Sequence, residues 1–373
     1  MRKDWEYKKF EECISKVPKT PKIQSSAYNQ GSKYPIISQE ENALISGFCD
    51  DESLLFHIER PVVIFGDHTR ALKYIDFDFA IGADGVKVIL PKAFLNAKFL
   101  LYYLKWYNIP NLGYSRHYKL LKEVFVPIPT TEKQLAIVAE LDKINELIQL
   151  KKQQLKDYDQ LAQSIFYEMF GDPVENEKGW EVKKLGEICS KIGSGATPKG
   201  GNNSYKDTGI SLIRSLNVHN NLFKYEDLAH IDDSQATALN NVIVKEKDIL
   251  LNITGASVAR CCIVPNDVLP ARVNQHVCII RIANESDSFY LNRLFTNDSY
   301  QSKLLALSKS KAATREALPK TIIESLSVPL PPLPLQQQFA ARIEAIERQK
   351  QQVSETIKDL ETLLASRMQY WFD

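Results

Sequence analysis

Loops rich in arginine, asparagine, glutamine and histidine are the parts of this sequence whose side chains could do chemistry. Arginine can pair bidentately with guanine, and asparagine or glutamine with adenine, while lysine and backbone amides bind phosphate. The chemistry that these residue types offer is therefore the reading of base edges in DNA. The candidate DNA-binding residues are His68, Arg70, Tyr114, Arg116, His117, Lys199, Asn202, Arg214, Asn217, Asn274, Gln275, Lys309, Lys311 and Arg315.

Any one of these residues, taken alone, is more often a solvated or turn-capping residue than a base contact. The DNA-binding hypothesis depends instead on clustering, because such residues gather in loops of both the front and the back half of the chain. Two separate clusters predict two separate reading surfaces.

Catalytic motifs are missing from the sequence. It has no Gly-x-x-x-x-Gly-Lys-Ser/Thr phosphate loop, Gly-x-Ser-x-Gly elbow, His-Glu-x-x-His zinc helix or Asn/Asp-Pro-Pro-Tyr/Phe methyltransferase signature. Gly193, Ser194 and Gly195 lack a third glycine, so we expect an ordinary flexible loop there rather than a phosphate cradle. His68 or His276 could serve as a general base, but neither has a nucleophile or metal frame nearby. We predict no catalytic or metal site.

Two internal repeats reveal the elements that must position these loops. Residues 126–171 align without a gap to residues 328–373, an offset of 202 positions (328 − 126), and residues 5–12 recur at 180–187. The plan is therefore module, long helix, module, long helix, in a pseudo-twofold repeat. We expect an α+β chain with two mixed α/β globular modules at 1–126 and 172–328, followed by helices at 127–171 and 329–373.

Each long helix follows a proline-rich stretch and then runs for about forty residues without glycine or proline. An apolar seam with a seven-residue period predicts a left-handed coiled coil, with the other helix as the economical partner. The alternatives are packing on the helix's own module or on another chain, and the seam does not decide between parallel and antiparallel pairing. The predicted seam is Ile137, Leu141, Ile144, Ile148, Leu155, Phe339, Ile343, Ile346, Val353, Ile357 and Leu360.

Inside the modules, short β-branched runs and apolar helical patterns predict the elements between the loops. We expect helices at residues 97–107 and 290–307. The predicted strands are 62–65, 86–90, 211–213, 248–253 and 277–280.

Composition is that of an ordinary globular protein, with 44% hydrophobic and 25% charged residues in a chain of 373. A net charge of +1 excludes a uniformly basic protein but not local basic patches. The six cysteines form no C-x-x-C pair, so we expect reduced, buried thiols. With no signal core and no apolar run long enough to span a bilayer, we expect a cytoplasmic protein without membrane contact.

The frame Trp-Glu-x-Lys-Lys-Leu-Gly-Glu-Ile at 180–188, the proline-rich stretch at 328–333 before Gln336, and a long helix after each module resemble the specificity subunit of type I restriction-modification systems. The resemblance covers essentially the whole chain. Departures are Lys133 and Leu335, where the family usually has an acidic residue before the glutamine, and Thr130-Thr131 in place of a second Pro-Leu pair. These departures concern the start of each helix and not the loops.

The resemblance implies target recognition domains that each read one half of a bipartite site in double-stranded DNA. It implies that the paired helices set the gap between the half-sites and dock the modification (methyltransferase) subunits. S-adenosylmethionine, ATP and Mg would belong to the modification and restriction (translocase/nuclease) subunits, with none bound by this chain. The alternatives are a non-DNA, protein-binding scaffold with a coiled-coil spacer, and the specificity subunit of a related methyltransferase-nuclease system.

Overall fold

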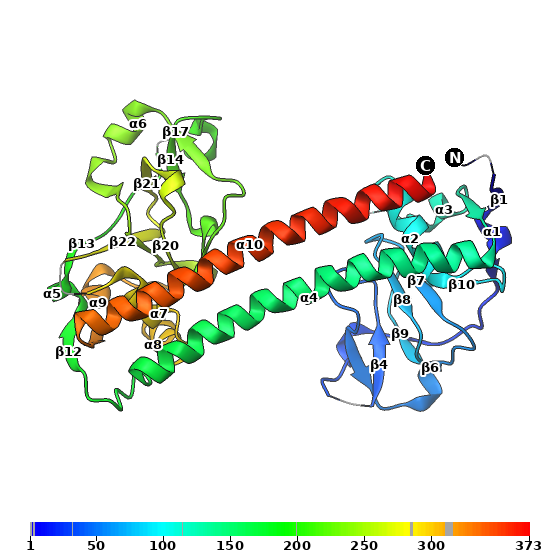
Figure 1. Ribbon diagram of the computed structural model, residues 1–373, viewed down its shortest axis with the longest axis horizontal. Helices are drawn as coiled ribbons and strands as arrows, with labels where there is room; N and C mark the ends of the chain where they lie inside the picture. Colours follow the sequence, from blue (N-terminus) through cyan, green and yellow to red (C-terminus); the bar gives the residue numbers. More distant parts are fainter. Residues whose placement is uncertain are drawn as a thin grey trace. The chain divides into compact units, whose positions relative to one another are not determined.

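The computed structural model describes residues 2, 4–31, 33–113, 115–198, 200–283, 286–309 and 316–373 (Figure 1). The chain divides into two compact units. Unit 1 comprises Met1–Gln153 with Ser354–Asp373, and unit 2 comprises Gln154–Val353. The long helices α4 (Thr131–Phe170) and α10 (Leu333–Phe372) each begin in one unit and end in the other.

One four-stranded antiparallel sheet has the same strand order in both units. In unit 1 the order is β2 (Ile14–Ser15), β10 (Val86–Pro91), β7 (Val62–Gly66), β8 (Leu72–Ile75). In unit 2 it is β13 (Cys189–Ser194), β22 (Val277–Ile282), β19 (Ile249–Asn252), β20 (Cys261–Ile263). Every residue of β7 and of β19 is buried, as expected for the central strand of a covered sheet. The sequence repeat is thus a repeat of sheet topology.

A two-stranded ribbon leads from each module into its long helix. The ribbon pairs β1 (Glu6–Lys9) with β11 (Phe125–Ile128) in unit 1, and β12 (Glu181–Lys184) with β23 (Ser327–Leu330) in unit 2. A short helix follows the first strand of each ribbon: α1 (Phe10–Cys13) and α5 (Leu185–Ile188). The Glu-x-Lys-Lys part of the repeated segment therefore forms the first strand of the ribbon.

The second sheet differs between the units. Unit 1 has the order β3 (Lys22–Ile23), β9 (Phe79–Gly82), β4 (Tyr34–Ile37), β5 (Gly47–Cys49), with β6 (Leu55–Phe56) on β9. Unit 2 has β17 (Ala229–Ile231), β14 (Ile210–Ile213), β21 (Ala271–Val273), β18 (Ile243–Val244), and a separate pair of β15 (Val218–His219) with β16 (Leu222–Phe223). The offset between equivalent residues is 175 at the first ribbon strand, 191 at Val86 and Val277, and 202 at the long helix. Of the 27 extra residues in the second repeat (202 − 175), 16 (191 − 175) therefore precede β22, in this part of the fold, and 11 (202 − 191) lie between β22 and the long helix.

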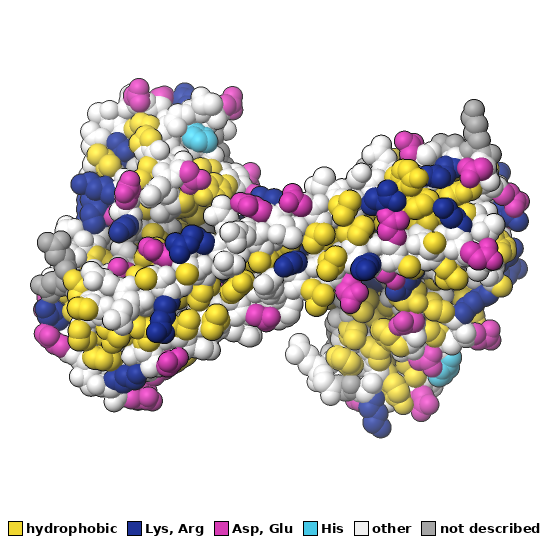
Figure 2. Space-filling view, viewed as in Figure 1, with side chains coloured by type: hydrophobic (Ala, Val, Ile, Leu, Met, Phe, Trp, Pro, Cys, Tyr) yellow, Lys and Arg dark blue, Asp and Glu magenta, His cyan; other side chains and the backbone are white. Residues whose placement is uncertain are grey.

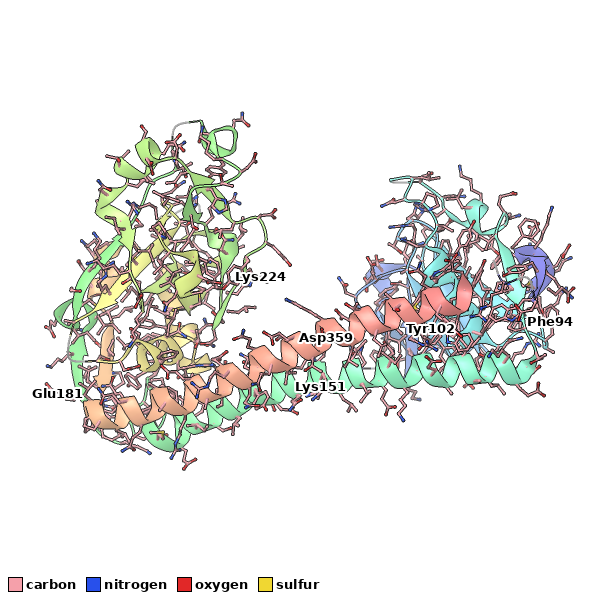
Figure 3. All side chains as sticks on the ribbon, turned by 45° about the horizontal axis from the view of Figure 1, so that its top comes forward. Phe94, Tyr102, Lys151, Glu181, Lys224 and Asp359 are labelled. Carbon is pink, nitrogen blue, oxygen red and sulfur yellow. The ribbon has the colours of Figure 1, made fainter. Side chains whose placement is uncertain are left out.

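The predicted helix at 97–107 is confirmed as α2 (Ala97–Tyr107), capped by the Asn96 side chain. Tyr102 on α2 donates a hydrogen bond of 2.7 Å to Asp142 on α4, and both Tyr102 and Phe94 lie beside α4 in Figure 3. The predicted single helix at 290–307 is wrong. It is divided into α7 (Ser288–Phe295) and α8 (Asp298–Ser308), because the Asn297 side chain accepts from the Ser299 N–H and starts a new helix.

The two long helices pack antiparallel within each unit, which the sequence left open. In unit 1, Arg367 near the end of α10 bonds Glu140 near the start of α4, while Lys152 further along α4 pairs with Glu361. In unit 2, Lys350 pairs with Asp159 at 2.7 Å, and Phe339 near the start of α10 packs on Phe166 and Phe170 near the end of α4. As the residue numbers rise along α4, the numbers of the residues that it contacts on α10 fall, so the two helices run in opposite directions within each unit.

Nine of the eleven predicted seam residues are buried, and Leu155 and Leu360 are half-buried. The seven-residue pattern breaks down toward the end of α4, where Ala162, Phe166 and Phe170 are buried and Ile165 and Met169 are only partly so. The reason is a change of partner. Phe166 stacks on Tyr290 of α7 at 5.8 Å between ring centroids, so this end of the helix belongs to the core of unit 2 as well as to the helix pair.

No helix in the described ranges is long and apolar enough to cross a membrane. All six cysteines are free, and burial raises the pKa of the Cys262 and Cys278 thiols to about 12. On the face shown in Figure 2, basic and acidic side chains are intermingled over both units, in keeping with the net charge of +1.

Candidate nucleic-acid interface

In unit 2, loops that are far apart in the sequence meet at one edge of the sheets. β14 and β21 are parallel, with Ile213 opposite Val273. Because the carboxyl ends of parallel strands lie at the same edge, Arg214 and Asn274, the next residues, follow the two strands at one place. The Asn274 N–H donates to the Ile213 carbonyl at 3.1 Å, which fixes this junction. The predicted residues of two loops are therefore brought together.

The loop after β13 joins the same edge through Gly195, whose N–H donates to the Asn274 carbonyl at 3.1 Å. A Cβ at Gly195 would lie 1.8 Å from the Val273 carbonyl oxygen, so only glycine allows this close approach. Gly193 and Ser194 belong to strand β13. The prediction of an ordinary flexible loop at 193–195 is thus wrong, because this segment is paired and packed.

A chain of hydrogen bonds runs through the side chains at this edge. The Thr197 hydroxyl donates to the Gln275 Oε1, and Gln275 Nε2 lies 3.1 Å from His276 Nε2. His276 Nδ1 lies 2.6 Å from the Thr254 hydroxyl oxygen. With Gln275 Nε2 donating, the His276 ring accepts at Nε2 and carries its proton at Nδ1, which donates to Thr254. Three loops are joined, and the Gln275 side chain remains exposed.

Asn217 and Asn274 hold the fold at this edge. Asn217 is fully buried, donates to the carbonyls of Lys224 and Glu226, and accepts from the Arg214 N–H. Asn274 is 5% exposed and its Oδ1 accepts from the His276 N–H. Because both residues are buried, a direct base contact from Asn217 or Asn274 does not fit the geometry.

Arg214 is half-buried, with its guanidinium carbon 5.2 Å from the Tyr205 ring centroid and an Nη2 that donates to the Asp227 carbonyl. Its Nε is buried without a partner. Lys309 is exposed directly after α8. Lys199, Lys311 and Arg315, together with the side chain of Asn202, lie outside the described residues.

In unit 1 the corresponding edge is organised by Asp67, which is 2% exposed. Its N–H donates to the Gly85 carbonyl at 2.7 Å, and its carboxylate accepts from the Tyr118 N–H at 2.7 Å. The fully buried His117 donates from both its backbone N–H and its Nδ1 to the Asp67 carbonyl, and its Nε2 accepts from the Leu112 N–H. With both ring nitrogens occupied, His117 positions the loop, and a base contact from it does not fit.

The other candidate residues of unit 1 that the structure describes lie in the segments next to Asp67 and His117. Arg70 has a left-handed backbone, φ 63°, and its guanidinium donates to the Ile109 carbonyl at 2.9 Å. His68 is half-buried and its N–H donates to the Gln39 Oε1. Arg116 is exposed, and Tyr114 lies outside the described residues. Arg116 is thus the predicted side chain of unit 1 that the structure leaves facing solvent.

A basic cavity of about 330 Å³ adjoins Arg70. Arg70, Lys73 and Lys105 line it together with Glu41. Burial lowers the pKa of Lys73, whose ammonium group donates to the Ser38 carbonyl at 2.9 Å. Three cations around one cavity offer contacts to a phosphate group, the sequence-independent part of DNA binding.

Sequence reasoning missed Asp67, Thr197 and Thr254, which hold the loops and the exposed side chains in place. No local signal marks them, because their partners lie in other loops. Among the described residues, no group of three or more His, Cys, Asp or Glu side chains could hold a metal ion.

Comparison with known proteins gives consistent matches. The family model described as type I restriction modification DNA specificity domain matches residues 2–157 and 177–362. The type I restriction enzyme MjaIX specificity subunit of Methanocaldococcus jannaschii is 28% identical over 291 residues. That match covers 70% of this chain and 65% of the relative's length.

Two solved structures share the fold. The S subunit of a type I restriction-modification system from M. genitalium gives a TM-score of 0.57 at 14% sequence identity. The match covers 98% of this chain and 95% of the M. genitalium chain. A chain from a study of complex assembly and conformational transition in the type I R-M system gives a TM-score of 0.56 at 18% sequence identity. The match covers 100% of this chain and 98% of that chain.

Proposed function

This chain belongs to the family of type I restriction modification DNA specificity domains, and we propose that it is the specificity subunit of a type I restriction-modification complex. Each globular module reads one half of a bipartite target in double-stranded DNA. The chain supplies recognition and no catalytic step of its own.

One observation carries this proposal: the same sheet frame presents different polar side chains in the two units. The β2-β10-β7-β8 and β13-β22-β19-β20 sheets share their strand order. Unit 1 exposes Arg116, next to His117 whose N–H donates to the Asp67 carbonyl, whereas unit 2 exposes Gln275 just before β22 and Lys309 directly after α8. A shared frame with different contact residues suits one task performed on two different sequences.

The proposed module boundaries are residues 1–126 and 172–328, with spacer helices at 127–171 and 329–373. We propose that these helices form a coiled coil that sets the gap between the half-sites and docks the modification subunits. Their antiparallel contacts in each unit and the burial of the apolar seam support this. Each helix has 40 residues and is about 60 Å long at about 1.5 Å per residue.

Joining two modules by a stiff spacer raises affinity without any new contact. Once one module has bound its half-site, the second binds at a high effective concentration, provided that the spacer matches the gap. Phosphate contacts supply much of the affinity for DNA, and a chain of net charge +1 shares those contacts with its partners.

The partners in this proposal are DNA, modification subunits and restriction subunits. S-adenosylmethionine, ATP and Mg serve the partners' methylation and cleavage chemistry. The place of action is the cytoplasm, where target DNA and partners meet.

Exchange of one module tests the assignment of half-sites. Residues 1–126 are replaced by the corresponding module of another family member, and the chain is co-expressed with its modification subunits. Sequencing of methylated sites is expected to show one new half-site and one retained. A change in both half-sites would refute independent reading.

Lengthening the helices tests the spacer. One heptad is inserted in each helix, after Gln153 and after Val353, so that the apolar seam stays in register. About 10 Å of added helix corresponds to roughly three base pairs, so the unread gap lengthens while both half-sites persist. An unchanged gap would refute the spacer role. Absence of salt-dependent DNA binding by the assembled complex would favour the protein-binding scaffold instead.

A further inference from the structure

Gln275 has an amide that is held in place and yet exposed. It lies just before β22, at the edge where the unit 2 loops meet. Its Oε1 accepts from the Thr197 hydroxyl, and its Nε2 lies 3.1 Å from His276 Nε2. The His276 ring is held in turn by Thr254 at 2.6 Å. The amide plane is therefore fixed by groups on three loops, although the side chain faces solvent.

Counting hydrogen-bonding sites shows what this amide has left. A glutamine amide offers two acceptor lone pairs and two N–H donors. Thr197 occupies one lone pair and His276 one N–H. One acceptor and one donor remain. Adenine presents in the major groove an N6 donor and an N7 acceptor, which need one acceptor and one donor from the protein.

We propose that Gln275 reads an adenine in the half-site of unit 2, with Thr197, His276 and Thr254 as positioning residues. This inference rests on the proposed function and adds to it the residue and the base. Fixing the amide before DNA binds reduces the side-chain entropy lost on binding, which strengthens binding.

A role for Gln275 as a mere loop tie is the simpler reading. The loops, however, are already joined by backbone bonds from the Gly195 N–H to the Asn274 carbonyl and from the Ile253 N–H to the His276 carbonyl. A buried side chain would have been enough to connect the loops, whereas the side chain of Gln275 is exposed.

A cavity of about 530 Å³ opens beside the network. His276 and Thr254 line it together with the apolar side chains of Leu216, Ala256 and Ala317, and Arg260 and Glu316 line it as well. The apolar part of this lining, next to an adenine-reading amide, suits the C5 methyl group of the paired thymine. The surroundings of Gln275 thus fit an A·T pair.

The corresponding position in unit 1 is occupied by a different residue. Val86 pairs with Gly66 where β10 begins, and Val277 pairs with Asn252 where β22 begins. Two residues before these strand starts lie Asp84 and Gln275, both exposed. A carboxylate only accepts hydrogen bonds, so Asp84 cannot make the adenine pair that Gln275 makes. The two half-sites therefore differ at this point.

The test uses the full chain in its complex with the modification subunits. The target of the unaltered complex is first determined by sequencing methylated DNA. Duplex libraries randomised across the unit 2 half-site are then selected by the complex carrying Gln275→Ala, Gln275→Glu or Asp84→Asn. The readout is the base preference at each position of the half-site. This preference can be measured even when a variant complex binds all DNA sequences more weakly.

For Gln275→Ala we expect the preference for one adenine to fall about 5- to 150-fold while every other position is retained. Gln275→Glu is expected to lose the same adenine, because it replaces the donor with an acceptor. Thr254→Val is expected to weaken the same position, and Thr254→Ser to preserve it. Asp84→Asn is expected to leave the unit 2 half-site unchanged.

Two failures are distinguishable. If the unaltered complex has a bipartite target and Gln275→Ala leaves all preferences intact, or alters a position other than an adenine, the inference is overturned and the proposed function stands. If the unaltered complex has no bipartite target that depends on this chain, both are overturned.

Discussion

Gln134 and Gln336 occupy the same place in the two repeats and make two equivalent hydrogen bonds. Each is buried in the first turn of a long helix, at 1% and 0% exposure. The Gln134 Oε1 accepts from the N–H of Asn96, the cap of α2, and the Gln336 Oε1 accepts from the N–H of Asp287, the cap of α7. Each Nε2 donates to a proline carbonyl of the preceding stretch. One side chain thus fastens each long helix to its module.

Removing either glutamine should destabilise the protein. Gln134→Ala and Gln336→Ala leave buried donors and acceptors unpaired, and we expect a loss of about 2–4 kcal/mol of unfolding free energy. Denaturant titration monitored by circular dichroism measures it. Gln149→Ala, an exposed site on α4, is the matched control and should change stability by less than about 0.5 kcal/mol. Equal effects at all three sites would contradict the fastening role.

Each long helix ends in a phenylalanine that belongs to the core of one unit. Phe372 packs on Phe99 and Tyr103 in unit 1, with ring centroids 5.5 Å apart in both pairs. Phe372→Ala should cost about 3–5 kcal/mol and speed hydrogen exchange in unit 1. Leu363→Ala, at a site 45% exposed on the same helix, is the control. Exchange that instead rises only in unit 2 would contradict the assignment of this helix end.

The equivalent residue on α4 gives the reciprocal prediction. Phe170 is 2% exposed and packs on Tyr290, with ring centroids 4.7 Å apart, in unit 2. Phe170→Ala should therefore loosen unit 2 by a similar free energy, seen as faster hydrogen exchange in α7. Unaltered exchange in α7 would show that this contact contributes little.

Arg367 makes the stability of unit 1 depend on pH through Glu140. Hydrogen bonds from Arg367 lower the pKa of Glu140 from its ordinary value of 4.5. A carboxyl group whose pKa is lowered by folding stabilises the protein above the ordinary value, and this contribution is lost as the pH falls below 4.5 through the folded pKa.

Glu140→Gln should therefore reduce the unfolding free energy at pH 7 by about 1 kcal/mol or less, since the pair is partly exposed. The difference from the unaltered protein should shrink as the pH falls below 4.5. Urea titrations between pH 3 and 7 measure this. A difference that stays constant over the whole range would rule out the ion pair as its source.

Arg116 and His117 are neighbours with opposite expected roles. Arg116→Ala should leave stability unchanged, weaken DNA binding by the assembled complex, and lower the slope of log affinity against log salt by about 1 if the contact is a phosphate. His117→Ala should cost about 2–3 kcal/mol because buried partners lose their bonds. Salt titrations of binding and thermal unfolding separate the two. A stable His117→Ala protein with altered base preference would reverse the assignment.

Patterns local in the sequence predicted the regular elements well. Strands β7, β10, β14, β19 and β22 fall where β-branched runs placed them, and nine seam residues are buried as the heptad required. The preference of asparagine for helix N-caps indicates a break at Asn297, between α7 and α8. The apolar pattern on both sides of Asn297 instead favoured a single helix.

The two loop edges that we propose contact DNA were only partly predictable, because they depend on contacts between distant loops. Gln275 could be nominated from its residue type, but the bonds that orient it come from Thr197 and, through His276, from Thr254. Residue type alone likewise favoured His117 and Asn217 as base contacts, whereas burial assigns both to the fold. The direction of helix pairing also needed the structure, since an apolar seam serves either orientation.

The most direct test of the central claim is to co-express the chain with the modification subunit of its system and to sequence the host DNA for modified bases. We predict a two-part methylated motif that disappears when this chain is deleted. Methylation that is unchanged by the deletion, with the partner shown to be active, would contradict a role in DNA specificity.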